Sequence, residues 1–157
     1  MKREYPKQPI VGVGGVVIEG SRVLLIQRGR PPLQGEWSIP GGMVELGESL
    51  AEGVRREVWE ETGLEVEPME VISVFDRIQK NGSRVQYHYV IVDYACRLKG
   101  GRLKSGSDVL DARWVKREEL PQYRVTPKAA SVIAEAFRLA KTTRKSPAAA
   151  IKADRAR

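Results

Sequence analysis

Cysteine and long apolar runs are nearly absent from this sequence of 157 residues. Its one cysteine, Cys96, forms no internal disulfide and gives no metal cluster, so we interpret it as a small buried apolar residue. No apolar run approaches the roughly 20 residues that a transmembrane helix needs. The charged N-terminus is not followed by the apolar region of a secretory signal. We therefore expect no membrane partner and favour the cytoplasm.

Charge is plentiful and unevenly distributed. The chain carries 27 Lys and Arg against 20 Asp and Glu, a formal net charge of +7. Residues 141–157 carry +5, whereas residues 42–64 carry −4. The sequence pI near 9.7 raises nucleic-acid binding as a hypothesis. Because most of the basic excess belongs to the last 17 residues, we interpret them as a solvated tail and do not expect nucleic acid. Contact of this tail with nucleic acid or another partner is the alternative.

The alternation of apolar segments and turn residues predicts one mixed α/β domain over residues 1–140, followed by a flexible basic tail over 141–157. Helices are expected from Ser49 to Thr62 and from Pro127 to about Ala140. The Asn81-Gly82 pair predicts a hairpin turn, because these residue types tolerate positive φ angles. Strands are expected at 11–18, 22–27, 37–39, 65–79 (as one strand or two), 84–97 and 111–115, with a turn at 100–101.

The helix over residues 49–62 has well-specified ends. Ser49 followed by Glu52 forms a capping-box pattern at its start, and Gly63 suits the left-handed position after its last turn. On a helical wheel one arc is apolar and should pack on the sheet. This arc contains Leu50, Ala51, Val54 and Val58.

A second arc of the same helix carries Glu57, Glu60 and Glu61 at spacing i, i+3, i+4. These carboxylates repel one another, and they lie in the C-terminal half of the helix, where its dipole disfavours anions. A divalent cation would resolve both problems, since Mg²⁺ prefers oxygen ligands and is commonly held by carboxylates and substrate phosphates. From the cluster alone, a solvated acidic face paired with Arg55 and Arg56 remains the alternative.

The segment from Gly42 to Leu64 fits the pattern Gly-x5-Glu-x7-Arg-Glu-U-x-Glu-Glu-x-Gly-U at all nine fixed positions, where U is aliphatic. Gly41 precedes it, and the adjacent glycines allow a tight backbone approach. The segment resembles the Nudix box, the signature of the Nudix hydrolases, and the resemblance covers about residues 8–140. It implies an α/β/α sandwich around a mixed β-sheet.

The resemblance also implies a metal-dependent enzyme that cleaves a diphosphate linkage. Mg²⁺ or Mn²⁺ would be held by Glu57, Glu60, Glu61 and the carbonyl of Gly41. Glu57 or a nearby acid would help to activate water, so the catalytic set would be these three glutamates with Arg56, which orients the adjacent glutamate.

Residues around this set have supporting roles in the same interpretation. Glu48 would support the metal site. Arg28, at the end of a strand, is a candidate phosphate ligand, with a plain surface arginine as the alternative, and Arg30 is a weaker candidate. An acid outside the box is left open among Asp108, Asp111, Glu118 and Glu119.

Several other signals favour structural roles. Gly12, Gly14 and Gly15 lack the third glycine and the helix of a dinucleotide-binding loop, so they indicate close strand packing. His88 alone favours a structural residue. Aromatic residues are expected in the core, with stacking on a nucleobase as the alternative; they are Trp37, Phe75, Tyr87 and Tyr89.

The substrate is the least determined part of this hypothesis. The runs 86–90, 107–108 and 112–115 resemble members assigned as ADP-ribose pyrophosphatases, which favours ADP-ribose or a related NDP-sugar. A nucleoside triphosphate pyrophosphatase that sanitises the nucleotide pool is the nearest rival. A non-catalytic Nudix module that senses nucleotides or binds nucleic acid is a third hypothesis, against which the intact box argues. Relatives that form dimers leave a homodimer open.

Overall fold

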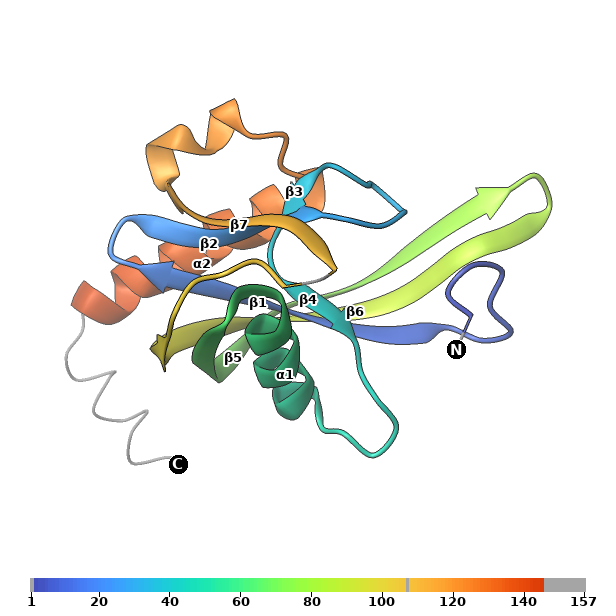
Figure 1. The fold of residues 1–157 in the computed structure, drawn as a ribbon, viewed down its shortest axis with the longest axis horizontal. Helices are drawn as coiled ribbons and strands as arrows, with labels where there is room; N and C mark the ends of the chain where they lie inside the picture. The colour runs from blue at the N-terminus through green and yellow to red at the C-terminus, as the bar shows by residue number, and fades with distance from the viewer. Residues whose placement is uncertain (1, 107, 146–157) are drawn as a thin grey trace.

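The computed structural model describes residues 2–106 and 108–145 (Figure 1). Strands and helices alternate along this part of the chain much as the sequence predicts. In chain order they are β1 (Ile10–Glu19), β2 (Arg22–Arg28), β3 (Trp37–Ser38), β4 (Gly41–Met43), α1 (Leu50–Thr62), β5 (Leu64–Asn81), β6 (Arg84–Gly101), β7 (Val109–Lys116), the 3-10 helix η1 (Arg117–Gln122) and α2 (Pro127–Lys145). No helix within the described ranges has the length and apolar character to cross a membrane.

The strands form one mixed sheet. Its order is β3-β2-β1-β6-β5, with β4 also beside β1 and β7 also beside β2. β1 and β6 run parallel, whereas the other neighbouring strands run antiparallel. β1 pairs with β6 along most of its length, with β4 at Gly12 to Gly14 and with β2 at its end, so both parts of the sheet extend from β1.

Both faces of β1 and β2 are buried, which explains why these strands are almost continuously apolar. Alternate residues point to opposite faces, and each face meets a different helix. The core on the α1 side includes Val13, Val17, Leu24, Val54 and Val58. The core on the α2 side includes Val16, Val23, Leu25, Ile133 and Phe137. The expected α/β/α sandwich is thus confirmed.

The β5–β6 hairpin is longer than expected. β5 is a single strand with several register shifts, and Gly82, at φ 65°, lies in the predicted turn. The hairpin tip projects from the body of the molecule (Figure 1). The sequence predicts that the strand ends near residue 97 and that a turn follows at 100–101. This prediction is wrong, because β6 continues to Gly101 and Gly100 still pairs with Glu65. Pairing with the neighbouring strand outweighs the turn signal of two glycines.

Two short elements and one helix end differ from the sequence expectations. β4 and η1 were not expected. α2 was expected to end near Ala140 but runs to Lys145, so the helix crosses the expected domain boundary. The sequence predicts a flexible tail over residues 141–157. Residues 146–157 of this tail lie outside the described ranges.

Candidate active site

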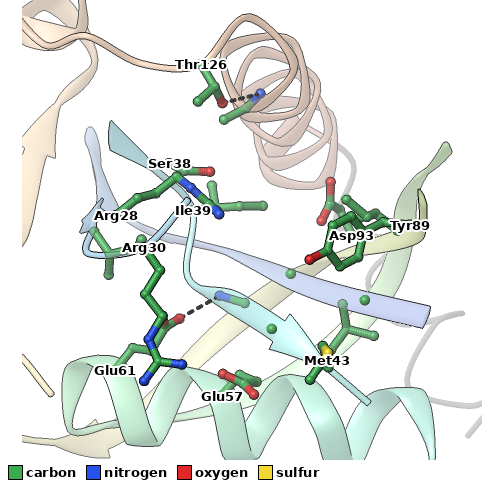
Figure 2. A pocket seen from close by; sticks show the side chains of 18 of the residues that line it. Arg28, Arg30, Ser38, Ile39, Met43, Glu57, Glu61, Tyr89, Asp93 and Thr126 are labelled. Atoms are coloured by element: carbon green, nitrogen blue, oxygen red, sulfur yellow. Dashed lines mark hydrogen bonds between the residues drawn. The ribbon is translucent and has the colours of Figure 1, made fainter. Parts of the chain in front are cut away.

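A pocket lies between the acidic side of α1 and the start of α2 (Figure 2). Backbone from β1 and β4, side chains from β5 and β6, and the end of β2 complete its lining. Gly41 and Arg28, both expected at the site, are part of this lining. Its acidic lining residues in the described part of the chain are Glu57, Glu60, Glu61, Asp93 and Asp108.

The ends of α1 fix where its glutamates lie. The Ser49 hydroxyl accepts a hydrogen bond from the Glu52 N–H at 3.1 Å, and the Glu52 carboxylate accepts one from the Ser49 N–H at 2.9 Å. At the other end Gly63 has φ 73° and donates to the Trp59 carbonyl. Both predicted caps are confirmed, and they set the start, the end and the rotation of the acidic arc.

Two glycines let β4 approach this arc. The Gly41 N–H donates to Glu61 Oε1 at 2.7 Å. A Cβ atom at Gly42 would overlap the Glu57 carboxylate, and one at Gly41 would overlap the Val13 carbonyl. A strand residue's N–H and carbonyl point to the same side, so the Gly41 carbonyl also faces α1. The glycine pair therefore brings backbone oxygen and carboxylates together.

Arg56 holds the acidic residues in a hydrogen-bonded network. Its guanidinium donates to both carboxylate oxygens of Glu48, at 2.7 and 2.9 Å, and to the Met43 carbonyl at 2.9 Å. It also donates to Glu57 at 2.8 Å and to Glu60 at 3.2 Å. The hydrogen bonds to Glu48 and Glu57 raise the pKa of Arg56, and the bond to Arg56 lowers the pKa of Glu48. Arg56 thus positions the glutamates.

Burial disfavours the charged forms of two glutamates in this network. It raises the pKa of Glu61 to about 8, against the lowering effect of the Gly41 N–H, and the neighbouring Glu57 raises it further. Burial also raises the pKa of Glu57, although Arg56 opposes this. Glu60 is different, because its side chain is 49% exposed at the rim of the pocket. The two buried carboxylates therefore lack enough positive charge nearby.

The residues present fit a hard divalent cation. The donors are carboxylate and carbonyl oxygens, which Mg²⁺ and Mn²⁺ prefer, and a cation would supply the missing positive charge. In residues 2–106 and 108–145, no three His, Cys, Asp or Glu side chains are already gathered in a metal-holding geometry. Glu57, Glu61 and the Gly41 carbonyl are the ligands best placed to hold the ion, with Glu60 at the rim.

Two arginine side chains, Arg28 and Arg30, line the pocket near these ligands. Arg28 Nε donates to the Pro32 carbonyl at 2.8 Å, and burial together with nearby Arg77 lowers the pKa of Arg28. Arg30 pairs with Asp108 at 2.7 Å, and both side chains are more than half exposed. Arg28 is thus a half-buried cation facing the acidic helix, whereas Arg30 has a carboxylate partner at the entrance.

The four acids left open by the sequence separate clearly. Asp108 alone among them lines the pocket. Asp111 pairs with Arg113 at 2.7 Å, and Glu119 accepts a hydrogen bond from the Lys116 N–H at the start of η1. Glu118 is exposed on η1. Asp108 is therefore the acid outside α1 and β6 that can face a ligand.

Asp93 was missed by the sequence analysis, although it lines the pocket and is 4% exposed. Burial raises its pKa to about 6, against the lowering effects of Lys128 and Arg77. The signal that could have revealed it is a single acid within the apolar run from Tyr87 to Cys96 of β6.

The aromatic candidates divide between core and pocket. Trp37 is buried and meets Tyr123 edge to face, with ring centroids 5.0 Å apart. Tyr87 is buried and stacks on Tyr89, which reaches the pocket together with Phe75. The expectation of core packing is thus confirmed for Trp37 and Tyr87, whereas Tyr89 and Phe75 face a ligand-sized space.

Comparisons with known proteins agree with this geometry. A family model described as the NUDIX domain matches residues 8–136. An ADP-ribose pyrophosphatase of Methanocaldococcus jannaschii is 32% identical over 114 residues, which are 73% of this chain and 66% of that protein. The 8-oxo-dGDP phosphatase NUDT18 of Homo sapiens is 36% identical over 107 residues, which are 66% of this chain and 31% of that protein. The chain thus spans just under two thirds of the first relative and less than a third of the second.

A solved structure shares the fold over most of the chain. The crystal structure of a MutT NUDIX hydrolase from Burkholderia pseudomallei superposes with a TM-score of 0.72 at 29% sequence identity. The match covers 82% of this chain and 98% of that chain. The α/β/α architecture is therefore shared by two chains of similar extent.

Proposed function

This chain belongs to the Nudix family, and from that premise we propose that it is a pyrophosphohydrolase that cleaves the diphosphate linkage of a nucleoside diphosphate derivative. The observation that carries the proposal is a pair of partly buried carboxylates at the pocket wall, Glu61 bonded to the Gly41 N–H and Glu57 packed against Gly42. Their arrangement supplies oxygen ligands where a charged diphosphate would have to bind.

The role of a divalent cation follows from the charge of the substrate. When bound, Mg²⁺ or Mn²⁺ would neutralise the diphosphate and lower the pKa of a water molecule. Glu57, Glu61 and the Gly41 carbonyl would hold the ion, with Glu60 as a further carboxylate at the rim. Arg56 orients the Glu57 carboxylate by donating a hydrogen bond to it, and the hydrogen bond from Arg56 to Glu48 keeps the guanidinium group in place.

The remaining steps fall to residues around the acidic helix. Glu57 or a nearby acid is proposed to help activate water, because its carboxylate lies at the wall of the pocket where the cation and the diphosphate would bind. Arg28, half-buried in the lining of the pocket, binds the diphosphate and stabilises the charge on the departing phosphate. Glu60 and Glu61 remain assigned to the metal site.

ADP-ribose is the substrate we propose first, because the M. jannaschii relative is named an ADP-ribose pyrophosphatase. A second candidate is a nucleoside di- or triphosphate with an oxidised base, which the similarity to the 8-oxo-dGDP phosphatase favours. We place the protein in the cytoplasm as a small-molecule enzyme. A homodimer and a solvated basic tail, neither of them needed for this chemistry, remain proposals.

A substrate panel tests the proposal. ADP-ribose, other NDP-sugars, dinucleoside polyphosphates and 8-oxo nucleotides are incubated with the protein and Mg²⁺ or Mn²⁺, and the phosphate-containing products are identified. We expect cleavage between two phosphates, giving AMP and ribose 5-phosphate from ADP-ribose. Absence of cleavage for every compound, in a protein that is folded by circular dichroism, would contradict the enzyme proposal.

A further inference from the structure

The pocket has two halves that are built from different parts of the chain. The α1 half contains Glu57, Glu61 and the backbone of β4. The β6 half contains Asp93, Tyr89 and neighbouring side chains of β5 and of the start of α2. Figure 2 shows Asp93 and Tyr89 together and well separated from Glu57 and Glu61. The hydrolytic chemistry proposed above uses the α1 half and leaves Asp93 without a role.

Asp93 is largely buried as a residue, but its carboxylate forms no hydrogen bond with the described residues, and its oxygens are open to the pocket. Its residue is 4% exposed, and no donor among the described residues lies within hydrogen-bonding distance of its oxygens. Lys128 and Arg77 act on it only through longer-range electrostatics, since neither forms an ion pair with it. A buried carboxylate without a donor is unfavourable, so its oxygens are available to a ligand in the pocket.

The backbone around Asp93 makes room for this side chain. Asp93 on β6 lies directly beside Gly14 on β1. A Cβ atom at Gly14 would overlap Asp93 Oδ1, so the carboxylate leans over the glycine. Gly12, two pairs along and opposite Ile91, also leaves β1 without a side chain on this face. Apart from the Asp93 carboxylate and the Ile39 side chain, which lie over Gly14, the floor of the β6 half is glycine backbone, which a flat group can approach closely.

The walls of the β6 half suit an aromatic heterocycle. Phe75 and Tyr89 supply aromatic rings, and Ile91 supplies apolar surface, on the same face of the sheet. Lys128 lies 4.4 Å from the centre of the Phe75 ring, at the side of the pocket next to α2. Flat apolar surfaces with one polar anchor are typical of sites that bind a nucleobase by stacking and orient it by a hydrogen bond.

We propose that Asp93 determines base specificity by accepting a hydrogen bond from an exocyclic amino group on the nucleobase of the substrate. An ionised carboxylate is an acceptor only, so it selects bases that present an N–H donor to it. Adenine presents an amino group at its six position, whereas hypoxanthine presents a carbonyl oxygen there, which the carboxylate repels. The inference rests on the proposed function, and it narrows the substrate to derivatives of amino-bearing nucleotides.

The test compares ADP-ribose with its inosine counterpart, which differs at that one position of the base. We expect wild-type kcat/KM to favour ADP-ribose by about tenfold to a hundredfold, the range of a specific hydrogen-bonded contact to a base. In Asp93→Asn the preference should disappear, because an amide side chain can donate to the carbonyl as well as accept from the amino group. The change should appear in KM rather than kcat, since Asp93 lies apart from Glu57.

Asp76→Asn is the matched control, because Asp76 is an exposed aspartate on the neighbouring strand β5 and does not line the pocket. It should keep the wild-type preference. Equal rates for both substrates in the wild type would overturn the inference. So would an equal loss for both substrates in Asp93→Asn, which would mean that Asp93 binds the sugar.

Calorimetry with AMP and IMP separates this inference from the proposed function, because it needs no turnover. Tighter binding of AMP than of IMP by the wild type, with the difference lost in Asp93→Asn, supports the role of Asp93 even if no substrate is hydrolysed. Equal affinities of the wild type for AMP and IMP would overturn the role of Asp93 even if ADP-ribose is cleaved.

Discussion

The two halves of the pocket treat their carboxylates in opposite ways. In the α1 half, Glu48, Glu57 and Glu61 accept hydrogen bonds from Arg56 or from the Gly41 N–H at 2.7–2.9 Å. In the β6 half, Asp93 is more deeply buried and accepts none from the described residues. Hydrogen bonds within the protein hold the α1 carboxylates in a fixed arrangement for chemistry, whereas Asp93 has no such bond and can accept one from the substrate. The difference implies that catalysis and base selection can be altered separately.

Glu57→Gln tests most strongly whether catalysis in the α1 half can be altered separately from base selection in the β6 half. We expect a fall in kcat of about 10²–10⁴-fold, the range of a lost general base, because the amide neither accepts a proton nor binds a cation strongly. Base preference should persist in the residual activity. Glu65→Gln, an exposed glutamate on β5, is the control and should behave as the wild type. An activity near that of the wild type in Glu57→Gln would show that the base lies elsewhere.

The pH dependence of stability tests whether the α1 half is built for a cation. Because burial raises the pKa of Glu61 to about 8, the folded protein holds this proton more tightly than the unfolded chain. In EDTA, protonation of Glu61 stabilises the folded protein fully below pH 4.5. This contribution to the free energy of unfolding, on the order of 2–4 kcal/mol, is lost as the pH rises through 8. Denaturant unfolding at pH 6 and pH 9 measures it.

Glu61→Gln is the control for that loss. Glutamine still accepts from the Gly41 N–H but does not ionise, so this variant should lose much less stability over the same pH range. Mg²⁺ should restore wild-type stability at pH 9, since a cation favours the ionised carboxylate. Equal pH dependence in both proteins would show that the Glu61 charge is already compensated in the fold.

Arg56→Lys tests the network that holds the α1 half in place. Lysine cannot reproduce the paired bonds to both oxygens of Glu48 together with the bond to Met43. We expect a loss of about 10–100-fold in metal affinity or activity, as for other groups that orient metal ligands. Arg55→Lys, on the exposed side of α1, is the matched control. Mn²⁺ titration followed by electron paramagnetic resonance measures the affinity, and unchanged binding would mean that Arg56 only stabilises the helix.

The smallest expected effect belongs to the β6 half. Burial raises the pKa of Asp93 to about 6, so its contribution to stability is present below pH 4 and lost as the pH rises through 6. Asp93→Asn should therefore stabilise the protein above pH 7 by about 1–2 kcal/mol, because it removes a buried unpartnered charge. Thermal unfolding at pH 8 measures this, with Asp76→Asn expected to change little. A destabilised Asp93→Asn would mean that the carboxylate has a partner in the fold.

The same comparison explains which features could be predicted from the sequence. The α1 half lies within the 24 consecutive residues 41–64, and its geometry follows from local rules: the capping box at Ser49, the left-handed Gly63 and the i, i+3, i+4 spacing of three glutamates. The apolar alternation of β1 and β2 likewise indicates a sheet covered on both faces. Features of this kind depend on residues that are close in the sequence, so they can be predicted before the fold is known.

The β6 half could not be predicted because it depends on strand register. Asp93 becomes a pocket residue only when β6 pairs in parallel with β1 and places it beside Gly14. Phe75 joins it through pairing with Ile91. The short strand β4 arises in the same way, since three residues with two glycines form a strand only by pairing with β1. Contacts between distant segments leave no periodic pattern in the sequence.

The central claim is that the α1 half binds a divalent cation for cleavage of a diphosphate. The most direct measurement is turnover of ADP-ribose by metal-free protein titrated with Mg²⁺ and with Mn²⁺, for the wild type and for Glu57→Gln. We predict no turnover in EDTA, a saturable rise in the wild type and only a small rise in the variant. Turnover that is independent of added cation, or a rise that is the same in both proteins, would contradict the claim.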